Sequence, residues 1–171
     1  MNKTMRIIGI DPGYAIVGYG VVDHGGYTFT TVDYGAVLTS AGVPFQRRLE
    51  QIWDELSAVL TKYKPEAMAV ERLYFTTNQK TAIDVAQARG VIQLCGIKHG
   101  AEIFEYTPLQ VKQAVVGYGK AEKSQVMQMT KTLLGLSGVP KPDDVADALA
   151  IAICHAHSAG SAVQKRLMHM K

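Results

Sequence analysis

Cysteine is scarce in this sequence, and long apolar runs are absent. The two cysteines, Cys95 and Cys154, lie inside helix-like patterns and lack the spacing of a metal-binding motif. We therefore expect two buried free thiols. No apolar run approaches the roughly 20 residues that a membrane-spanning helix needs, and the N-terminal stretch lacks the apolar core of a secretory signal. These absences predict a cytoplasmic protein.

A histidine cluster and a strong net charge are also missing. The five histidines form no ligand pattern, so we expect them at the surface or at helix ends; they are His24, His99, His155, His157 and His169. With 47% apolar residues, 19% charged residues and a formal net charge of +3, the 171-residue chain is typical of one globular domain with a sizeable core. The net charge alone identifies no partner.

Positive charge is nevertheless concentrated in one segment. Between Thr107 and Leu134 there are four lysines and a single acid, Glu122. The lysines are Lys112, Lys120, Lys123 and Lys131. If this segment faces an acidic site, it would suit a polyanionic substrate. A solvated, lysine-bearing surface is the alternative interpretation.

The segment around Asp11 organises the first part of the chain. Residues 7–10 are apolar and rich in isoleucine, which is typical of a buried central strand, and a carboxylate and a Pro-Gly turn follow at once. Residues 16–22 and 27–38 predict two further strands, joined by the hairpin signal Gly25-Gly26. Short links between sequential strands indicate antiparallel neighbours.

A second strand that ends in an acid follows a long helix. Apolar residues at spacings of three and four predict an amphipathic helix over residues 45–63, and Pro65 ends it. Residues 67–70 then form a short apolar strand, and Glu71 comes directly after it. A strand–helix–strand crossover places the new strand parallel to the first. We therefore expect Asp11 and Glu71 at the same edge of the sheet, where ligands of α/β proteins gather.

The rest of the chain completes one α/β domain. We expect a five-stranded mixed sheet whose last strand covers residues 101–106. The remaining elements are helices, which we expect over residues 79–98, 108–116, 122–134 and from 143 onward. The helix over 79–98 has a face rich in small residues, which makes it our candidate for a subunit interface. From about residue 158 the apolar pattern fades, so we divide the chain into one α/β domain over 1–157 and a basic, frayed tail over 158–171.

Two acids on the last helix join the pair at the sheet edge. Asp144 and Asp147 are three residues apart and share one helix face; Asp147 lies among alanine and leucine, so it needs a partner or a metal. Like charges about 4 Å apart repel by roughly 4 kcal/mol at an effective dielectric near 20. Together with Asp11 and Glu71 they indicate a site for Mg²⁺ or Mn²⁺, because carboxylates without His or Cys suit hard cations. Such sites catalyse displacement at phosphate.

Two aromatic residues, Tyr74 and Phe75, follow Glu71 in an expected loop. They could stack on nucleic-acid bases, or pack against the helix that comes next.

Several short motifs now occur in a fixed order over about residues 5 to 157. They are Gly9-Ile-Asp11-Pro-Gly13, Gly18-Tyr-Gly20-Val21, Val70-Glu71 followed by the aromatics, Gln87-Ala-Arg89-Gly90, Lys112-Gln113-Ala-Val-Val-Gly117, Ala121-Glu-Lys123-Ser-Gln-Val126 and Asp144-Val-Ala-Asp147-Ala-Leu-Ala-Ile151. In this combination the sequence resembles the RuvC family of bacterial Holliday-junction resolvases.

The resemblance implies an RNase H-like α/β fold, with helices on both faces of the five-stranded mixed sheet, and a homodimer. It implies Mg²⁺-dependent endonuclease action on four-way DNA junctions in recombination and repair, with two symmetric nicks in strands of like polarity. Two metal ions per site are expected, and Mn²⁺ as a substitute for Mg²⁺. The family also works with the RuvA–RuvB branch-migration complex, so that complex is an expected partner.

The resemblance also assigns site residues. The catalytic and metal-binding carboxylates of the family fall on Asp11, Glu71, Asp144 and Asp147, and some members carry histidine at the position of Asp144. The aromatic side chain inserted at the junction centre falls on Tyr74, where some members have phenylalanine. The predicted DNA contacts are Tyr74, Phe75, Arg89, Lys112, Lys120 and Lys123.

Three alternatives involve different chemistry. An actin-like or sugar-kinase-type ATPase also begins with a strand, an Asp-x-Gly turn and a hairpin, but it needs a second lobe, and there is no P-loop pattern. A related nuclease of the same fold could act on RNA; the ordered motifs after residue 87 favour the junction resolvase. A non-cleaving junction-binding scaffold would have no need of the intact carboxylates.

Overall fold

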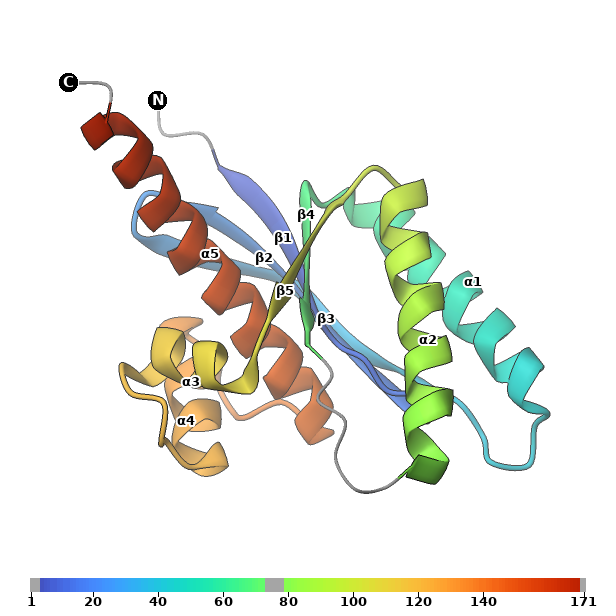
Figure 1. Cartoon of the computed structure of the whole chain (residues 1–171). Coiled ribbons are helices and arrows are strands. Elements are labelled where there is room, and N and C mark those ends of the chain that lie inside the picture. Colours follow the sequence, from blue (N-terminus) through green and yellow to red (C-terminus); the bar gives the residue numbers. More distant parts are fainter. Residues whose placement is uncertain (1–3, 73–78, 170–171) are drawn as a thin grey trace.

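The computed structural model describes residues 4–72 and 79–169, with the backbone alone for 79–80 and 160–169. Five strands form one sheet in the order β3-β2-β1-β4-β5, and five helices pack around it (Figure 1). The strands are β1 (Met5–Asp11), β2 (Ile16–Gly25), β3 (Thr28–Leu38), β4 (Ala67–Glu71) and β5 (Glu102–Tyr106). The helices are α1 (Phe45–Tyr63), α2 (Gln79–Lys98), α3 (Pro108–Val116), α4 (Lys123–Leu133) and α5 (Asp143–His169).

The sheet is mixed, as the sequence predicts. β1, β2 and β3 are antiparallel neighbours, and Asp11 pairs with Gly18. β4 runs parallel to β1, and β5 runs parallel to β4 with Glu71 opposite Tyr106. Since β1 and β4 are adjacent and parallel, Asp11 and Glu71 end neighbouring strands at the same edge. The predicted helical crossover between these strands is therefore confirmed.

Helices cover both faces of the sheet, and each face has its own hydrophobic core (Figure 1). One core joins alternate residues of β1 and β4, such as Ile8 and Val70, to α1 and α2. The other joins the opposite set, such as Ile7 and Ala69, to α3, α4 and α5. Because side chains alternate along a strand, residues 11 and 71 are in phase with the second set. The carboxylates that end these strands therefore belong to the face that α5 covers.

Two glycines let α5 lie close to the sheet. A Cβ atom at Gly9 would overlap the backbone oxygen of Ala148, and one at Gly18 would overlap that of Asp144. The first residue lies in β1 and the second lies opposite Asp11 in β2. The glycine motifs of the sequence thus bring the start of α5 against the strand that carries Asp11.

Two details differ from the sequence patterns. α5 continues to His169, so helical backbone extends past residue 157; the division into a domain and a tail stays a prediction.

The expectation that all histidines lie at the surface or at helix ends is wrong for His155, which is 3% exposed. Its Nδ1 is 2.8 Å from the hydroxyl of Tyr106, and burial lowers its pKa to about 4. A neutral imidazole with one polar partner is compatible with the core.

Both cysteines are free and buried, as predicted. Within the described part of the chain, no helix has the length and apolar character needed to cross a membrane.

Candidate active site

The acidic edge of the sheet is built from three elements. β1 ends in Asp11, β4 ends in Glu71, and the first two turns of α5 carry Asp144 and Asp147. The pKa of Asp11 is raised to about 7, because burial disfavours its charged form and the charges of Glu71, Asp147 and Asp144 add to this. Asp11 therefore lies within electrostatic range of the other three predicted carboxylates.

Glu71 and Asp147 respond to the same environment. Burial is the main reason why the pKa of Glu71 is raised, and the charge of Asp147 acts in the same direction. Burial also raises the pKa of Asp147, while the ammonium group of Lys123 opposes this rise. A group of carboxyls with raised pKa values at the end of two neighbouring strands is typical of a functional site.

Lys123 supplies the nearest positive charge. Its Nζ atom lies 2.9 Å from Oδ2 of Asp147 and 3.9 Å from Oδ2 of Asp143. Its pKa is raised, mainly by the hydrogen bond to Asp147. Asp143 is further paired with Lys141, whose Nζ atom donates a 2.6 Å hydrogen bond to it. The half-buried Asp147 carboxylate therefore has the partner that its place among apolar residues requires.

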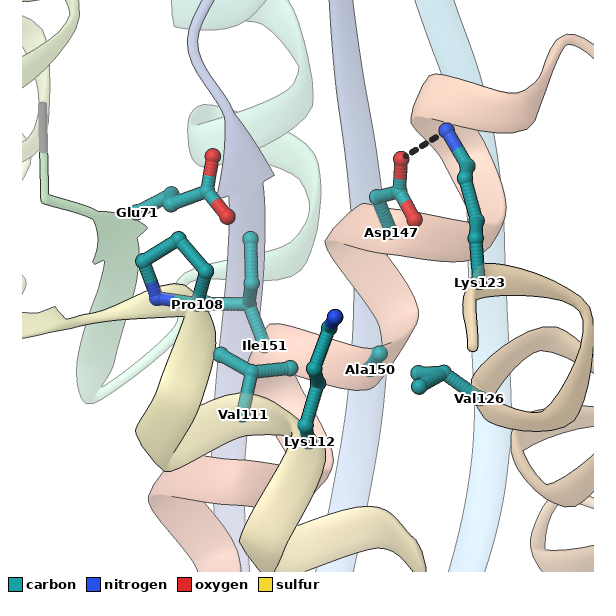
Figure 2. A pocket seen from close by; sticks show the side chains of 9 residues that line it. All are labelled: Glu71, Pro108, Val111, Lys112, Lys123, Val126, Asp147, Ala150 and Ile151. Carbon is teal, nitrogen blue, oxygen red and sulfur yellow. Dashed lines mark ion pairs between the residues drawn. The ribbon is translucent and has the colours of Figure 1, made fainter. Parts of the chain in front are cut away.

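A pocket of about 250 Å³ opens between the acids and the lysines (Figure 2). Its lining residues are Glu71, Pro108, Val111, Lys112, Lys123, Val126, Asp147, Ala150 and Ile151. Figure 2 shows Lys112 reaching from α3 toward the space between Glu71 and Asp147. Two carboxylates and two ammonium groups thus share one cavity, and it can receive a phosphate group and a cation together.

The donor set fits a hard divalent cation in its chemistry. All four acids offer carboxylate oxygens, the ligands that Mg²⁺ and Mn²⁺ prefer. Among the described residues, however, no three His, Cys, Asp or Glu side chains stand close enough to form a finished metal cage. The protein holds these carboxylates near Asp11, and the ammonium group of Lys123 partly balances the charge of Asp147.

The predicted DNA contacts have different positions. Lys112 and Lys123 line the pocket, whereas Lys120 is exposed between α3 and α4 and does not line it. Tyr74 and Phe75 lie outside the described residues.

Arg89 has partners within the protein. Its side chain is 16% exposed and forms an ion pair with Glu105, and its Nε atom donates to the carbonyl oxygen of Glu71 at 3.4 Å. Its role as a DNA contact stays a prediction. No local sequence pattern singles out Glu105, because the residues that hydrogen-bond to it lie at least 12 residues away along the chain and on another element.

Fold and site together define the class of the protein. A mixed sheet whose two central parallel strands end in acids, with a further acidic pair on a helix packed against them, is the arrangement of RNase H-like nucleases. A model of the family "crossover junction endodeoxyribonuclease RuvC" matches residues 7–155. The chain belongs to this family of endonucleases.

Individual relatives agree with this assignment. The crossover junction endodeoxyribonuclease RuvC of Alkaliphilus oremlandii is 58% identical over 154 residues, which are 90% of this chain and 94% of the relative. The structure of Thermus thermophilus RuvC superposes with a TM-score of 0.85 at 37% identity, covering 92% of this chain and 97% of that one. The structure of Thermus thermophilus RuvC in complex with a Holliday junction substrate gives a TM-score of 0.86 at 38% identity, covering 91% and 94%.

Proposed function

We propose that this protein resolves four-way DNA junctions, cutting two strands of like polarity at symmetric positions. The observation that carries the proposal is the pocket in which Glu71 and Asp147 face Lys112 and Lys123, in a chain of the RuvC family. Cleavage of a phosphodiester needs both kinds of group. Cationic groups lie near the phosphate oxygens, and acidic groups position the attacking nucleophile. The structure of the Thermus thermophilus relative in complex with a Holliday junction substrate supports the same substrate.

The proposed catalytic and metal-binding residues are Asp11, Glu71, Asp144 and Asp147. They would hold Mg²⁺, two ions per site, and Mn²⁺ would substitute for it. A bound divalent cation supplies a nucleophile from water at neutral pH and stabilises charge at the phosphate. The support is the chemistry of the donor set and the raised pKa of Asp11, which burial and, after it, the charges of the neighbouring acids cause.

The proposed DNA contacts act around this centre. Lys112 and Lys123 hold the phosphate backbone at the pocket, and Lys120 extends the basic surface beside it. Tyr74 or Phe75 stacks on bases at the junction. The support for the aromatic role is their place in the sequence, where Tyr74 comes three residues after Glu71, the residue that ends the strand.

We also propose a homodimer, because paired nicks need two sites related by a two-fold axis. The candidate interface is the outer face of α2, where Ile83, Leu94 and Ile97 are 66%, 51% and 59% exposed. Gly90 lies on the same face, and a Cβ atom there would meet no atom of the chain within 4 Å. A glycine within a helix costs about 1 kcal/mol relative to alanine. No contact within the described protomer requires a glycine at position 90, so the close approach of α2 from a second protomer explains why a glycine is there.

Gly90→Ala separates the stability of the protomer from that of the dimer. We expect the protomer to gain roughly 0.5–1 kcal/mol, because alanine is the better helix former and meets no neighbour. We expect the dissociation constant of the dimer to rise about 10-fold, because the added methyl groups hold the two helices apart. Analytical ultracentrifugation over a concentration series measures the second effect.

Asp54→Ala, on the exposed face of α1, is the control and should leave the dimer unchanged. An unaltered dissociation constant for Gly90→Ala would place the interface elsewhere. From family membership we also propose that the RuvA–RuvB complex is a partner.

The test of function compares a labelled synthetic four-way junction with a linear duplex and an RNA–DNA hybrid of the same sequence, in Mg²⁺ or EDTA. Paired, symmetric, Mg²⁺-dependent nicks in the junction alone are the expected result. Equal cutting of junction and duplex would indicate a general nuclease, and preferred cutting of the hybrid an RNA-directed one. Binding without cutting would indicate a scaffold.

A further inference from the structure

A charged cluster lies behind the acidic edge, on the α2 side of the sheet. Glu105 of β5 is its centre. Its Oε1 atom accepts a hydrogen bond from Arg89 and a 2.8 Å hydrogen bond from Nε2 of Gln93, both on α2. Its Oε2 atom lies 3.6 Å from Nε of Arg72, the residue after β4. One carboxylate therefore joins a helix, an edge strand and the end of β4.

This cluster contacts Glu71 through its backbone. The Nε atom of Arg89 donates to the carbonyl oxygen of Glu71 at 3.4 Å. The backbone N–H of Arg72 donates to the carbonyl oxygen of Tyr106 at 2.8 Å, which extends the pairing of β4 and β5 by one residue past Glu71. The backbone on both sides of the Glu71–Arg72 peptide bond is thus held to β5 and α2.

The cluster and the active-site pocket lie on opposite faces of the sheet. Glu71 lines the pocket with Asp147, whereas Val70, its neighbour in β4, packs in the core beneath α1 and α2. Glu105 is paired with Val70 in the register of the two strands. Neither Arg89 nor Glu105 lines the pocket. Their contacts fix the strand that carries the Glu71 carboxylate while leaving the carboxylate itself free.

We propose that Arg89 and Glu105 are positioning residues for Glu71, which hold the end of β4 so that its carboxylate faces Asp147 across the pocket. The hydrogen bond from Arg89 lowers the pKa of Glu105, so the Glu105 carboxylate stays ionised at neutral pH. The inference rests on the proposed function, since it gives the cluster a role in the same metal-dependent cleavage. It assigns Arg89 to the protein scaffold rather than to DNA.

Glu105→Ala is the main test. It removes the carboxylate that accepts hydrogen bonds from α2 and pairs with Arg72, so the end of β4 can shift. Small displacements of a catalytic group reduce the reaction rate by up to about 100-fold. We expect cleavage of the four-way junction to fall by about 10- to 100-fold, and half-maximal cleavage to need about 5-fold more Mg²⁺. Junction binding in EDTA should stay within about twofold of wild type, since the lysines are untouched.

Two readouts separate positioning from general loss of structure. The rise in Tm on adding Mg²⁺, measured without DNA, should shrink in Glu105→Ala relative to wild type. Glu105→Gln keeps an acceptor for Arg89 and Gln93, so it should recover most of the activity. The matched control is Glu50→Ala, which removes the exposed Arg47–Glu50 ion pair on α1 and should leave every quantity unchanged.

Two outcomes would overturn the proposal. A wild-type Mg²⁺ requirement and cleavage rate in Glu105→Ala would show that the cluster does not position Glu71. Weaker junction binding in EDTA for Arg89→Ala, with Glu105→Ala binding normally, would make Arg89 a DNA contact. If wild-type protein cuts no junction, the proposed function fails separately, and the Mg²⁺-dependent rise in Tm alone decides whether Glu105 positions Glu71.

Discussion

Asp11→Asn is expected to abolish junction cleavage and to preserve junction binding. The amide keeps the shape of the side chain but removes one negative ligand from the acidic cluster that β1, β4 and α5 assemble. Loss of one such carboxylate removes several kcal/mol of transition-state stabilisation, which corresponds to a rate loss of roughly 10³-fold or more. The basic residues Lys112 and Lys123 remain in place, so binding should be retained. Single-turnover cleavage and electrophoretic mobility in EDTA measure the two quantities.

The same substitution should stabilise the metal-free protein above neutral pH. Burial and the neighbouring acids raise the pKa of Asp11 from 3.8 to about 7. A carboxyl whose pKa is higher in the folded state contributes stability below its unfolded value, and that contribution is lost as the pH rises through the folded value. For Asp11 the free energy of unfolding should therefore fall by about 4 kcal/mol between about pH 4 and pH 7.

Thermal unfolding in EDTA checks this sign. Asp11→Asn should lose the part of the pH dependence that comes from this residue, and at pH 8 its Tm should exceed that of wild type by at least about 5 °C. Mg²⁺ should raise the Tm of wild type more than that of the variant. A lower Tm for the variant in EDTA would mean that the Asp11 carboxylate has a structural partner, and retained nicking would remove it from the catalytic set.

Gly18→Ala is expected to reduce junction cleavage strongly, although glycine at this position carries no reactive group. Its new methyl group would overlap the backbone of Asp144, so α5 must move away from β2 or the strand must bend. Overpacking of this kind costs roughly 1–3 kcal/mol of stability. Because Asp144 and Asp147 move with the helix while Asp11 does not, we expect cleavage to fall by about 100-fold. Chemical denaturation and junction cleavage report the two losses.

Gly138→Ala is the matched control. This glycine precedes α5 in a loop, and a Cβ atom there meets nothing within 4 Å. It should leave stability and cleavage close to wild type. If Gly18→Ala cleaved junctions normally while losing stability, close packing of α5 would matter for folding alone.

Local sequence patterns determined the elements and most of the predicted site. The strand that ends in Asp11, the crossover to the strand that ends in Glu71, and the helix with acids three residues apart all follow from periodicity and turn residues. These signals are readable because alternation and helical spacing report which face of an element is buried. The convergence of the acids follows in turn, since parallel neighbouring strands end at one edge of the sheet.

Only the tertiary structure decided which side chains pair across these elements. Lys123 pairs with Asp147 and Arg89 pairs with Glu105, although each pair is separated by at least 16 residues in sequence. His155 is buried against Tyr106, although the lack of a ligand pattern among the histidines predicted a position at the surface or at a helix end. Such partners depend on how helices cross the sheet, and the crossing depends on close contacts such as those at Gly9 and Gly18. Residue types and spacing specify the faces of the elements, whereas packing between distant elements specifies the contacts.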